Sequence, residues 1–535
     1  MKNKRQFPLH PILWALFPPL ALLGDNISHI TPVNAVRTIV VTWVVTLVLW
    51  GLFRLLIGRW GKAAVIVTSF LVLFFSYGHI YNLIQNRLFF GVNVGRHRVL
   101  FPLFILTWVV IIVWIGRRRD VRGLTMALNL IGTVVLIFPI YQIVTHEVRS
   151  ATKDVRAPNE AVQAEVADLQ IPSGRYAPDI YYIILDTYTR ADTLSEFFSY
   201  DNVGFIEALE NKGFYVAGCS QSNYSFTTLS LATSLNFNYP QTLSQNFTTS
   251  NKNISDVYPL IYNNAVAFAL HKLGYRFEAV DSGFSPTEIT GADVYYTPED
   301  DWQRIILGDG INSFESIELN TSAGMLLYEF NSYLPKSLRN FLSAYVLHRE
   351  RILYALDVLD GMGSIPGPKF VFVHILAPHN PFVFGPNGEY IERKTPFTLN
   401  DDRDVVKLKD YISGYRDQVN YLNQRMLTIV NHLLENSKQP PIIVIQGDHG
   451  TLRLAEWQDT ILNAYYLPDS TQTHLYPGIS PVNTFRVIFN TYFSGQLPIL
   501  PDQACSTNAN DDPFSCVPVP DPNPQCATSV GNQNP

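Results

Sequence analysis

Five apolar stretches, almost free of charge, occupy the first part of the chain. Four of them reach the roughly 18–22 residues that a helix needs to cross about 30 Å of hydrocarbon. The first is shorter and contains Pro18 and Pro19. A signal peptide is its alternative, but no small-residue cleavage site follows Leu23. We therefore predict a transmembrane domain over residues 1–146 with about five spans. The stretches are Pro11–Leu23, Ala35–Leu56, Ala63–Tyr81, Val99–Gly116 and Gly123–Val144.

Basic residues flank these stretches unevenly, and this asymmetry predicts the orientation in the membrane. The N-terminus is basic, and further basic residues lie around Arg59 and Arg119, in the loops after the second and fourth spans. The loop before the fourth span, with Arg96, is an exception. The balance places the N-terminus in the cytoplasm, so five crossings put everything after Val144 outside. We expect a multi-pass protein of the cytoplasmic membrane with a large C-terminal part on the outer side, where disulfides can form.

A polar segment over residues 147–174 follows, which we interpret as a juxtamembrane linker or helix. Beyond it, short apolar runs rich in β-branched and aromatic residues alternate with helical patterns such as Val419–Leu434. Buried strands that alternate with helices indicate a mainly parallel sheet covered by helices on both faces. This predicts an α/β domain over residues 175–500. The strand-like runs are Ile180–Leu185, Phe370–Leu376 and Ile442–Ile445.

The tail over residues 501–535 is rich in Cys, Pro and Asn, and we expect it to form a surface extension or a partly disordered end. Three of the four cysteines lie in it. Pairing of Cys505 with Cys516 is the preferred disulfide because it closes a short loop, although sequence alone does not fix the connectivity.

Composition agrees with a membrane protein and narrows its partners. Hydrophobic residues make up 47% of the chain and charged residues 16%, well below the roughly 25% charged residues of a typical soluble protein. The net charge of −6 disfavours a nucleic-acid-binding protein. The expected partner is therefore the lipid bilayer, and no nucleic acid.

Acidic residues follow two of the predicted strands directly. Asp186 comes after Ile180–Leu185, and Asp448, His449 and Gly450 come after the run at Ile442. In a parallel sheet, ligands bind at the carboxyl edge of the strands. Carboxylates with an imidazole suit a divalent metal ion such as Mn, Mg, Ca or Zn. The alternative is that the two acids only cap the helices that follow them.

These segments carry a resemblance. Residues 178–186 resemble the opening strand of the alkaline phosphatase superfamily, in particular its sulfatase-like branch, and residues 448–450 resemble its second metal motif. The match extends over about residues 178–495. The predicted spans before it resemble the arrangement of lipoteichoic-acid-synthase-type membrane proteins. The resemblance implies that Asp186, Asp448 and His449 are metal ligands. It also implies that His379, with His374 as a weaker candidate, faces the ester group of a substrate.

The nucleophile that the resemblance implies is not obvious in this sequence. The corresponding segment is residues 222–235, which lacks the Cys/Ser-x-Pro-x-Arg motif of sulfatases. Counting by family spacing places Tyr224 at the nucleophile position, and a shift by one residue offers Asn223 or Ser225. Ser225 and Thr227 are the nearest hydroxyls that a metal ion could activate. The alternative is an ordinary polar helix start.

Two functions follow from this resemblance. The first is a membrane-anchored, metal-dependent hydrolase or transferase that acts on phosphate or sulfate esters of envelope lipids or polymers outside the membrane. The second is a catalytically degenerate, sulfatase-like sensor or binding domain. A metal site without a correctly placed hydroxyl would favour the second.

Overall fold

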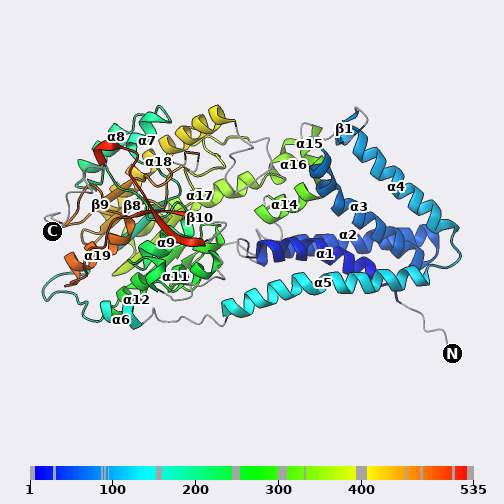
Figure 1. The fold of residues 1–535 in the computed structure, drawn as a ribbon, viewed down its shortest axis with the longest axis horizontal. Helices are drawn as coiled ribbons and strands as arrows, with labels where there is room; N and C mark the ends of the chain where they lie inside the picture. The colour runs from blue at the N-terminus through cyan, green and yellow to red at the C-terminus, as the bar shows by residue number, and fades with distance from the viewer. Residues whose placement is uncertain are drawn as a thin grey trace. The chain divides into compact units, whose positions relative to one another are not determined.

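The computed structural model contains two compact units (Figure 1). The helical unit contains residues 1–152 together with residues 300–347, and the α/β unit contains most of the remaining chain. The structure describes residues 7–27, 30, 32–85, 88–89, 92–93, 95–151, 160–243, 254–298, 310–330, 333–392, 407–451, 453–454, 456–469, 474–508 and 512–526. Parts of the predicted linker (152–159) and tail (509–511 and 527–535) lie outside these residues.

The helical unit contains four helices that are long and apolar enough to cross a membrane: α2 (Val33–Ile57), α3 (Trp60–Ile84), α4 (His97–Arg117) and α5 (Arg122–Ala151). They match four of the five predicted spans. The remaining predicted span, which is the first along the chain, corresponds to α1 (His10–Asn26). This helix of 17 residues contains Pro18 and Pro19 and packs against α2, α3 and α5. Its length of about 26 Å falls short of the hydrocarbon thickness, so the count of five spans stays a prediction.

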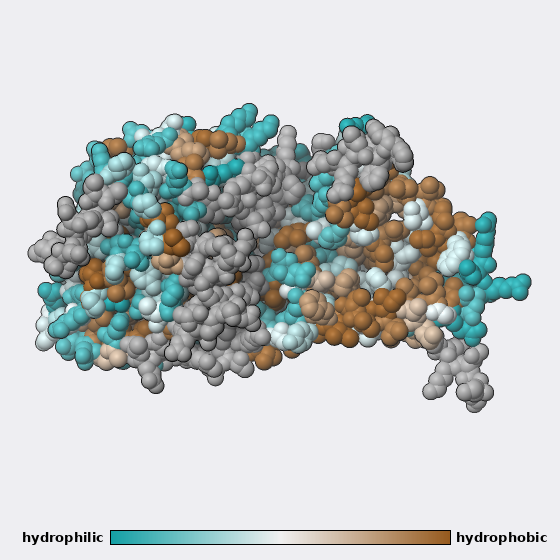
Figure 2. Space-filling view, in the orientation of Figure 1, coloured by the Kyte–Doolittle hydropathy of each residue, from teal (hydrophilic) through white to brown (hydrophobic). Residues whose placement is uncertain are grey.

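Apolar side chains remain on the outer faces of these helices. Val41 on α2, Leu106 on α4 and Ile137 on α5 are each at least half exposed, and Figure 2 shows hydrophobic residues over much of this unit. An exposed apolar surface of this extent is typical of contact with lipid. A short hairpin, β1 (Leu88–Phe89) with β2 (Val92–Asn93), lies between α3 and α4.

Residues 310–347 pack with the helical unit, although the sequence analysis places them within the α/β domain. The guanidinium of Arg37 on α2 bonds both carboxylate oxygens of Glu315, and Asn312 and Glu315 form a capping box at the start of their helix. Asn312 also donates to the carbonyl of Asn34 (2.9 Å). These bonds secure the segment to α2. Its elements are α14 (Ser313–Thr321), η4 (Ala323–Met325), α15 (Leu326–Glu329) and α16 (Lys336–Phe341).

The α/β unit is built on a seven-stranded sheet with the order β4-β9-β8-β3-β7-β5-β6. The five strands from β8 to β6 are parallel, and β9 and β4 add antiparallel pairs at one edge. The mainly parallel α/β fold predicted from sequence is therefore confirmed. The strands are β3 (Ile180–Leu185), β4 (Tyr215–Val216), β5 (Arg276–Val280), β6 (Val294–Tyr296), β7 (Lys369–Ile375), β8 (Ile442–Gly447) and β9 (Asn463–Tyr466).

Helices cover both faces of this sheet, and its central strands are therefore buried throughout. One core joins alternate strand residues such as Tyr182 and Phe372 to α9, α11, α12 and α19, and α18 lies on the opposite side (Figure 1). The helices of the unit are α6 (Glu160–Glu165), α7 (Ala191–Glu196), α8 (Val203–Glu210), α9 (Thr227–Leu235), α10 (Pro240–Leu243), η2 (Ile254–Val257), α11 (Tyr258–Tyr262), α12 (Ala265–Lys272), η3 (Ser285–Thr287), α17 (Ala344–Gly361), η6 (Met362–Ser364), α18 (Leu408–Asn436) and α19 (Pro481–Tyr492).

The tail forms a hairpin where the sequence predicts only an extension. Strands β10 (Ala504–Asn508) and β11 (Asp512–Val519) pair antiparallel, and the predicted disulfide Cys505–Cys516 joins them. The two remaining cysteines form a second disulfide, Cys219–Cys526, whose partners lie 307 residues apart.

Candidate metal centre and nucleophile

The register of the central strands brings the predicted acids together. Leu185, the last residue of β3, pairs with Gly447 of β8 on one side and with Ile375 of β7 on the other. Asp186 and Asp448 therefore leave the sheet side by side. The turn is fixed by two hydrogen bonds: Asp186 N–H donates to Ile375 O (2.9 Å), and Thr187 N–H donates to Asp448 Oδ1 (2.9 Å). Thr187 has a φ of 60°, which is a strained conformation for a β-branched residue.

Asp186 and Asp448 form a buried cluster with His374 of β7. One ligand atom from each of the three residues lies within 4.8 Å of the others, and all three are buried. His374 Nε2 lies 3.4 Å from Asp186 Oδ2. The two acids therefore meet at the carboxyl edge of the sheet. The third member of the cluster, His374, is named in the sequence analysis only as a weaker candidate that faces the ester.

His449 lies beside this cluster. Its Nε2 is 3.6 Å from Asp448 Oδ2 and 3.9 Å from Asp186 Oδ1. Its Nδ1 lies 2.8 Å from the carbonyl oxygen of Gly450. A carbonyl only accepts hydrogen bonds, so this contact places a proton on Nδ1 and directs Nε2 toward the carboxylates.

The charges of the cluster stabilise one another. Burial, the largest influence, opposes ionisation of Asp186, but the imidazoles of His379, His374 and His449 outweigh it and lower the pKa of Asp186 well below its usual range. Burial likewise opposes the charged form of His449, and the carboxylates of Asp448 and Asp186 outweigh it, so the pKa of His449 is raised. The site therefore favours negative carboxylates surrounded by imidazoles.

The residues present fit a divalent cation. Asp186 Oδ1, Asp448 Oδ2 and His374 Nε2 are buried and have no hydrogen-bond partner among the described residues. Leaving three such atoms unpaired in one place is costly unless a ligand satisfies them. Two carboxylate oxygens with one or two imidazole nitrogens form a donor set that Zn²⁺ or Mn²⁺ accepts.

Thr227 is the hydroxyl that the fold brings to this cluster. It is the first residue of α9, and its Oγ1 lies 3.3 Å from His449 Nε2. Phe226 occupies the N-cap position, so no side chain caps this end of the helix. Ser230, one turn later, donates its hydroxyl to Asp448 O (2.6 Å) and connects the helix to the loop after β8. The start of α9 thus faces the cluster with both a hydroxyl and a positive helix end.

The other hydroxyls of this segment are placed differently. Tyr224, the position given by family spacing, is fully buried, and its hydroxyl pairs with the side-chain amide of Gln241. Ser225 is buried, but its hydroxyl makes no hydrogen bond to the described residues of the cluster. His379 lies near Asp186, whose carbonyl accepts its backbone N–H (3.0 Å), and its ring is partly buried.

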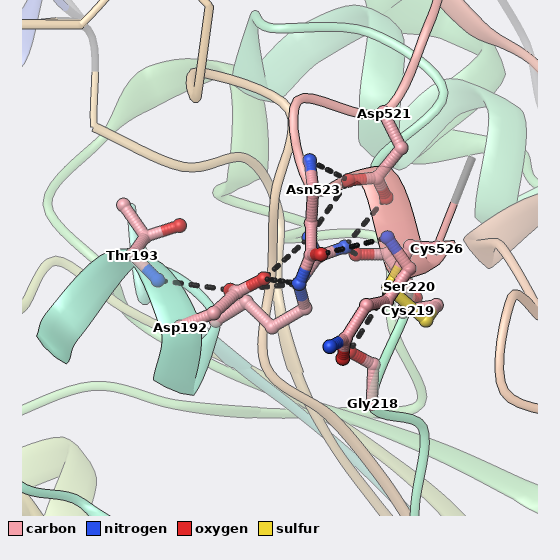
Figure 3. Close-up of a disulfide and its surroundings, with 10 residues drawn as sticks. Asp192, Thr193, Gly218, Cys219, Ser220, Asp521, Asn523 and Cys526 are labelled. Carbon is pink, nitrogen blue, oxygen red and sulfur yellow. Dashed lines mark hydrogen bonds and ion pairs between the residues drawn. A yellow bond between two sulfur atoms is a disulfide. The ribbon is translucent and has the colours of Figure 1, made fainter. Parts of the chain in front are cut away.

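A C-terminal anchor, defined here as Pro501–Cys505 together with Asp521–Cys526, fixes the segment that leads to Thr227. The disulfide Cys219–Cys526 holds one end of that segment (Figure 3). Closer to Thr227, Cys505 N–H donates to Asn223 O (3.0 Å), and the Asn223 amide donates to Gln503 O (3.0 Å). The anchor therefore constrains the chain four residues before Thr227.

Asp459 is a second residue that sequence reasoning missed. It is 1% exposed, and neither of its carboxylate oxygens has a hydrogen-bond partner in the part of the chain that the structure describes. Its backbone carbonyl accepts the N–H of Ser222 (2.6 Å). Burial raises its pKa to about 7, and the charge of His449 offsets only part of that effect. His374, an imidazole inside an apolar strand, was named from the sequence as a weaker candidate, but Asp459 has no recognisable motif.

Solved structures similar to this chain are phosphoethanolamine transferases and sulfatases. The C-terminal periplasmic domain of EptC from Escherichia coli, in a complex with Zn, is 13% identical, covers 68% of this chain and 98% of its own, and has a TM-score of 0.42. The integral membrane protein EptA from Neisseria meningitidis, a lipooligosaccharide phosphoethanolamine transferase, is 12% identical, with coverages of 91% and 95% and a TM-score of 0.37.

A protein from Bacteroides thetaiotaomicron assigned to the sulfatases is 11% identical, covers 64% of this chain and 75% of its own, and has a TM-score of 0.35. No protein-family model and no curated protein matches the chain. At these identities and TM-scores, the function must be argued from the site itself.

Proposed function

We propose that this chain is a membrane-anchored, metal-dependent enzyme that cleaves or transfers a phosphate or sulfate ester, with Thr227 as its nucleophile. The observation that supports this most directly is the 3.3 Å separation between Thr227 Oγ1 and His449 Nε2. It brings a hydroxyl to the edge of a buried Asp–His–Asp cluster. A hydroxyl is a weak nucleophile until a neighbouring cation or base activates it.

Asp186, His374, Asp448 and His449 would hold the cation, which when bound polarises the ester and lowers the pKa of a hydroxyl. Thr227 gives up its proton to water, and its Oγ1 forms a bond to phosphorus or sulfur while the bond to the leaving oxygen breaks. His379 supplies the proton that the leaving oxygen needs. The oxygen of water or of an acceptor alcohol then bonds to phosphorus or sulfur as the bond to Thr227 Oγ1 breaks. The proton of the acceptor passes to His379, and Thr227 Oγ1 regains its proton from water.

The start of α9 contributes to this step through its backbone. The first N–H groups of a helix have no partner within the helix, and here no side chain caps them. They can therefore bind the oxygens on which negative charge develops in the transition state. The placement of the nucleophile at the first helical position puts these donors next to the reacting atom.

The membrane anchor favours substrates that share the same surface. An enzyme tethered to a bilayer meets lipids and attached polymers at a raised effective concentration. We therefore propose a lipid or an envelope polymer as the source of the ester, on the outer side of the cytoplasmic membrane. Zn, Mn, Mg and Ca are the candidate metal ions.

The test compares two hydroxyl deletions in the purified full-length protein. Thr227→Ala should abolish turnover of any phosphate or sulfate ester that the wild type cleaves, while Ser225→Ala, the matched control, should keep most of it. Thr227→Ser should retain part of the activity because it keeps the hydroxyl. Mass spectrometry of the wild type quenched during turnover should find the transferred group on Thr227.

Two outcomes would contradict this proposal. Loss of turnover in Ser225→Ala with normal turnover in Thr227→Ala would mean that Ser225, and not Thr227, is the nucleophile. The second outcome is a wild type that cleaves no ester in a panel of phospholipids, aryl phosphates and aryl sulfates with each candidate metal. The chain would then be a sensor or binding protein and not an enzyme.

A further inference from the structure

A pair of hydroxyls lies behind His374, on the side away from Asp186. Thr287 Oγ1 is 2.9 Å from His374 Nδ1 and 2.9 Å from Ser282 Oγ. It is also 3.1 Å from the carbonyl oxygen of Phe284. Thr287 is fully buried at the end of η3, in the connection between β5 and β6. The ring of Phe284 meets the imidazole edge-on, with the two centroids 6.2 Å apart. The ring of His374 is thus held on two sides.

The hydrogen bonds of Thr287 fix the position of a proton on the imidazole. The carbonyl of Phe284 only accepts, so the hydroxyl of Thr287 donates to it. The same oxygen is then free to accept a hydrogen bond from His374 Nδ1, and this contact favours the tautomer that carries its proton on Nδ1. Nε2 is left with its lone pair, and this is the nitrogen that lies 3.4 Å from Asp186 and has no hydrogen bond. Only an unprotonated nitrogen can bind a metal ion.

We propose that Thr287 is a positioning residue for the metal centre: its hydroxyl holds the ring of His374 with Nδ1 protonated and Nε2 directed at the carboxylates of Asp186 and Asp448. This rests on the proposed function, because it assumes that the cluster binds a divalent cation. A histidine that ligates a metal usually donates its other N–H to a fixed acceptor, and loss of that acceptor typically weakens metal binding about 10–100-fold.

The experiment measures metal affinity in place of activity. Purified full-length protein is stripped of metal with a chelator and titrated with Zn²⁺ and with Mn²⁺ by calorimetry. Thr287→Val, which keeps the shape and removes the hydroxyl, should bind about 10–100-fold more weakly than the wild type. Thr287→Ser restores the hydroxyl and should stay within about threefold of it.

The matched control is Thr233→Val. Thr233 is equally buried, but its hydroxyl bonds only to Leu229 O in its own helix (2.7 Å). Its removal should leave metal affinity unchanged. Thermal denaturation of the metal-free variants checks that each is folded, and Thr287→Ala replaces the valine variant if valine does not fold.

If Thr287→Val binds Zn²⁺ and Mn²⁺ as tightly as the wild type does, the proposal is overturned. Equal weakening in Thr287→Val and Thr287→Ser would also overturn it, because the hydroxyl would then not be the cause. If the wild type itself binds no divalent metal, the metal centre of the proposed function fails, and this outcome is distinct from a selective effect at Thr287.

Discussion

Arg190 and Asp521 form a buried ion pair with two parallel hydrogen bonds, of 2.8 and 2.9 Å, across 331 residues of sequence. The same guanidinium bonds both oxygens of Asp192 and the carbonyl of Ser220. All five N–H donors of Arg190 are thereby used. Because Arg190 follows Asp186 closely, this network joins the loop after β3 to the C-terminal anchor.

Removal of the Asp521 charge should destabilise the protein. In Asp521→Asn, the buried guanidinium loses a charged partner, and breaking such a pair typically costs about 2 kcal/mol or more. The melting temperature of the full-length protein should therefore fall by several degrees. Asp357→Asn is the matched control, because Asp357 is 68% exposed in its pair with Arg425 and exposed pairs contribute little. An equal effect in both variants would contradict the importance of the buried network.

The two disulfides should differ in their contribution to stability. Cys219–Cys526 closes a loop of 307 residues and Cys505–Cys516 a loop of 11. If cross-links act mainly by restricting the unfolded chain, the free-energy loss should be about twice as large for the longer loop. Denaturant unfolding of the two double Cys→Ser variants measures this difference. A greater loss for Cys505–Cys516 would mean that native contacts of the hairpin dominate instead.

Asp459 should make the stability of the metal-free protein depend on pH. Its pKa is raised from 3.8 to about 7 by burial, so the native state holds a proton that the unfolded state has already released. The free energy of unfolding therefore falls as pH rises from about 4 to about 7 and then levels off. Asp459→Asn removes this dependence. The melting temperature of the variant should rise relative to that of the wild type between pH 5 and pH 8. A constant difference would mean that the pKa of Asp459 is not raised.

Much of the fold was readable from the sequence because its central strands are continuous apolar runs, and β3 has the predicted bounds, Ile180–Leu185. The meeting of Asp186 and Asp448 followed from the common edge of parallel strands. The role of His374 could not be read, because its approach to Asp186 depends on the register that pairs it with Ile184. Family spacing pointed to Tyr224, whereas the observed start of α9 brings Thr227 to the site. Segments distant in sequence fix that start.

Metal binding should stabilise the folded protein. A ligand that binds only the native state raises its stability by about 2.7 kcal/mol at a hundred times its dissociation constant. Addition of Zn²⁺ or Mn²⁺ to chelator-treated protein should therefore raise the melting temperature. Asp448→Asn should abolish most of this shift, because it removes the charge of one buried ligand. An unchanged shift in that variant would place the metal elsewhere.

The orientation in the membrane can be tested with single cysteines and an impermeant thiol reagent on whole cells. The four native cysteines form two disulfides and leave no free thiol. Because α5 separates the two positions, a cysteine at Ala157 should be labelled and one at Arg119 should not; the reverse pattern would invert the topology.

A third cysteine, Asn3→Cys, tests whether α1 crosses the membrane. If α1 crosses the membrane, four crossings separate Asn3 from Arg119, and both stay unlabelled. If α1 does not cross, three crossings remain, and Asn3→Cys is labelled while Arg119→Cys is protected, which would overturn the prediction of five spans.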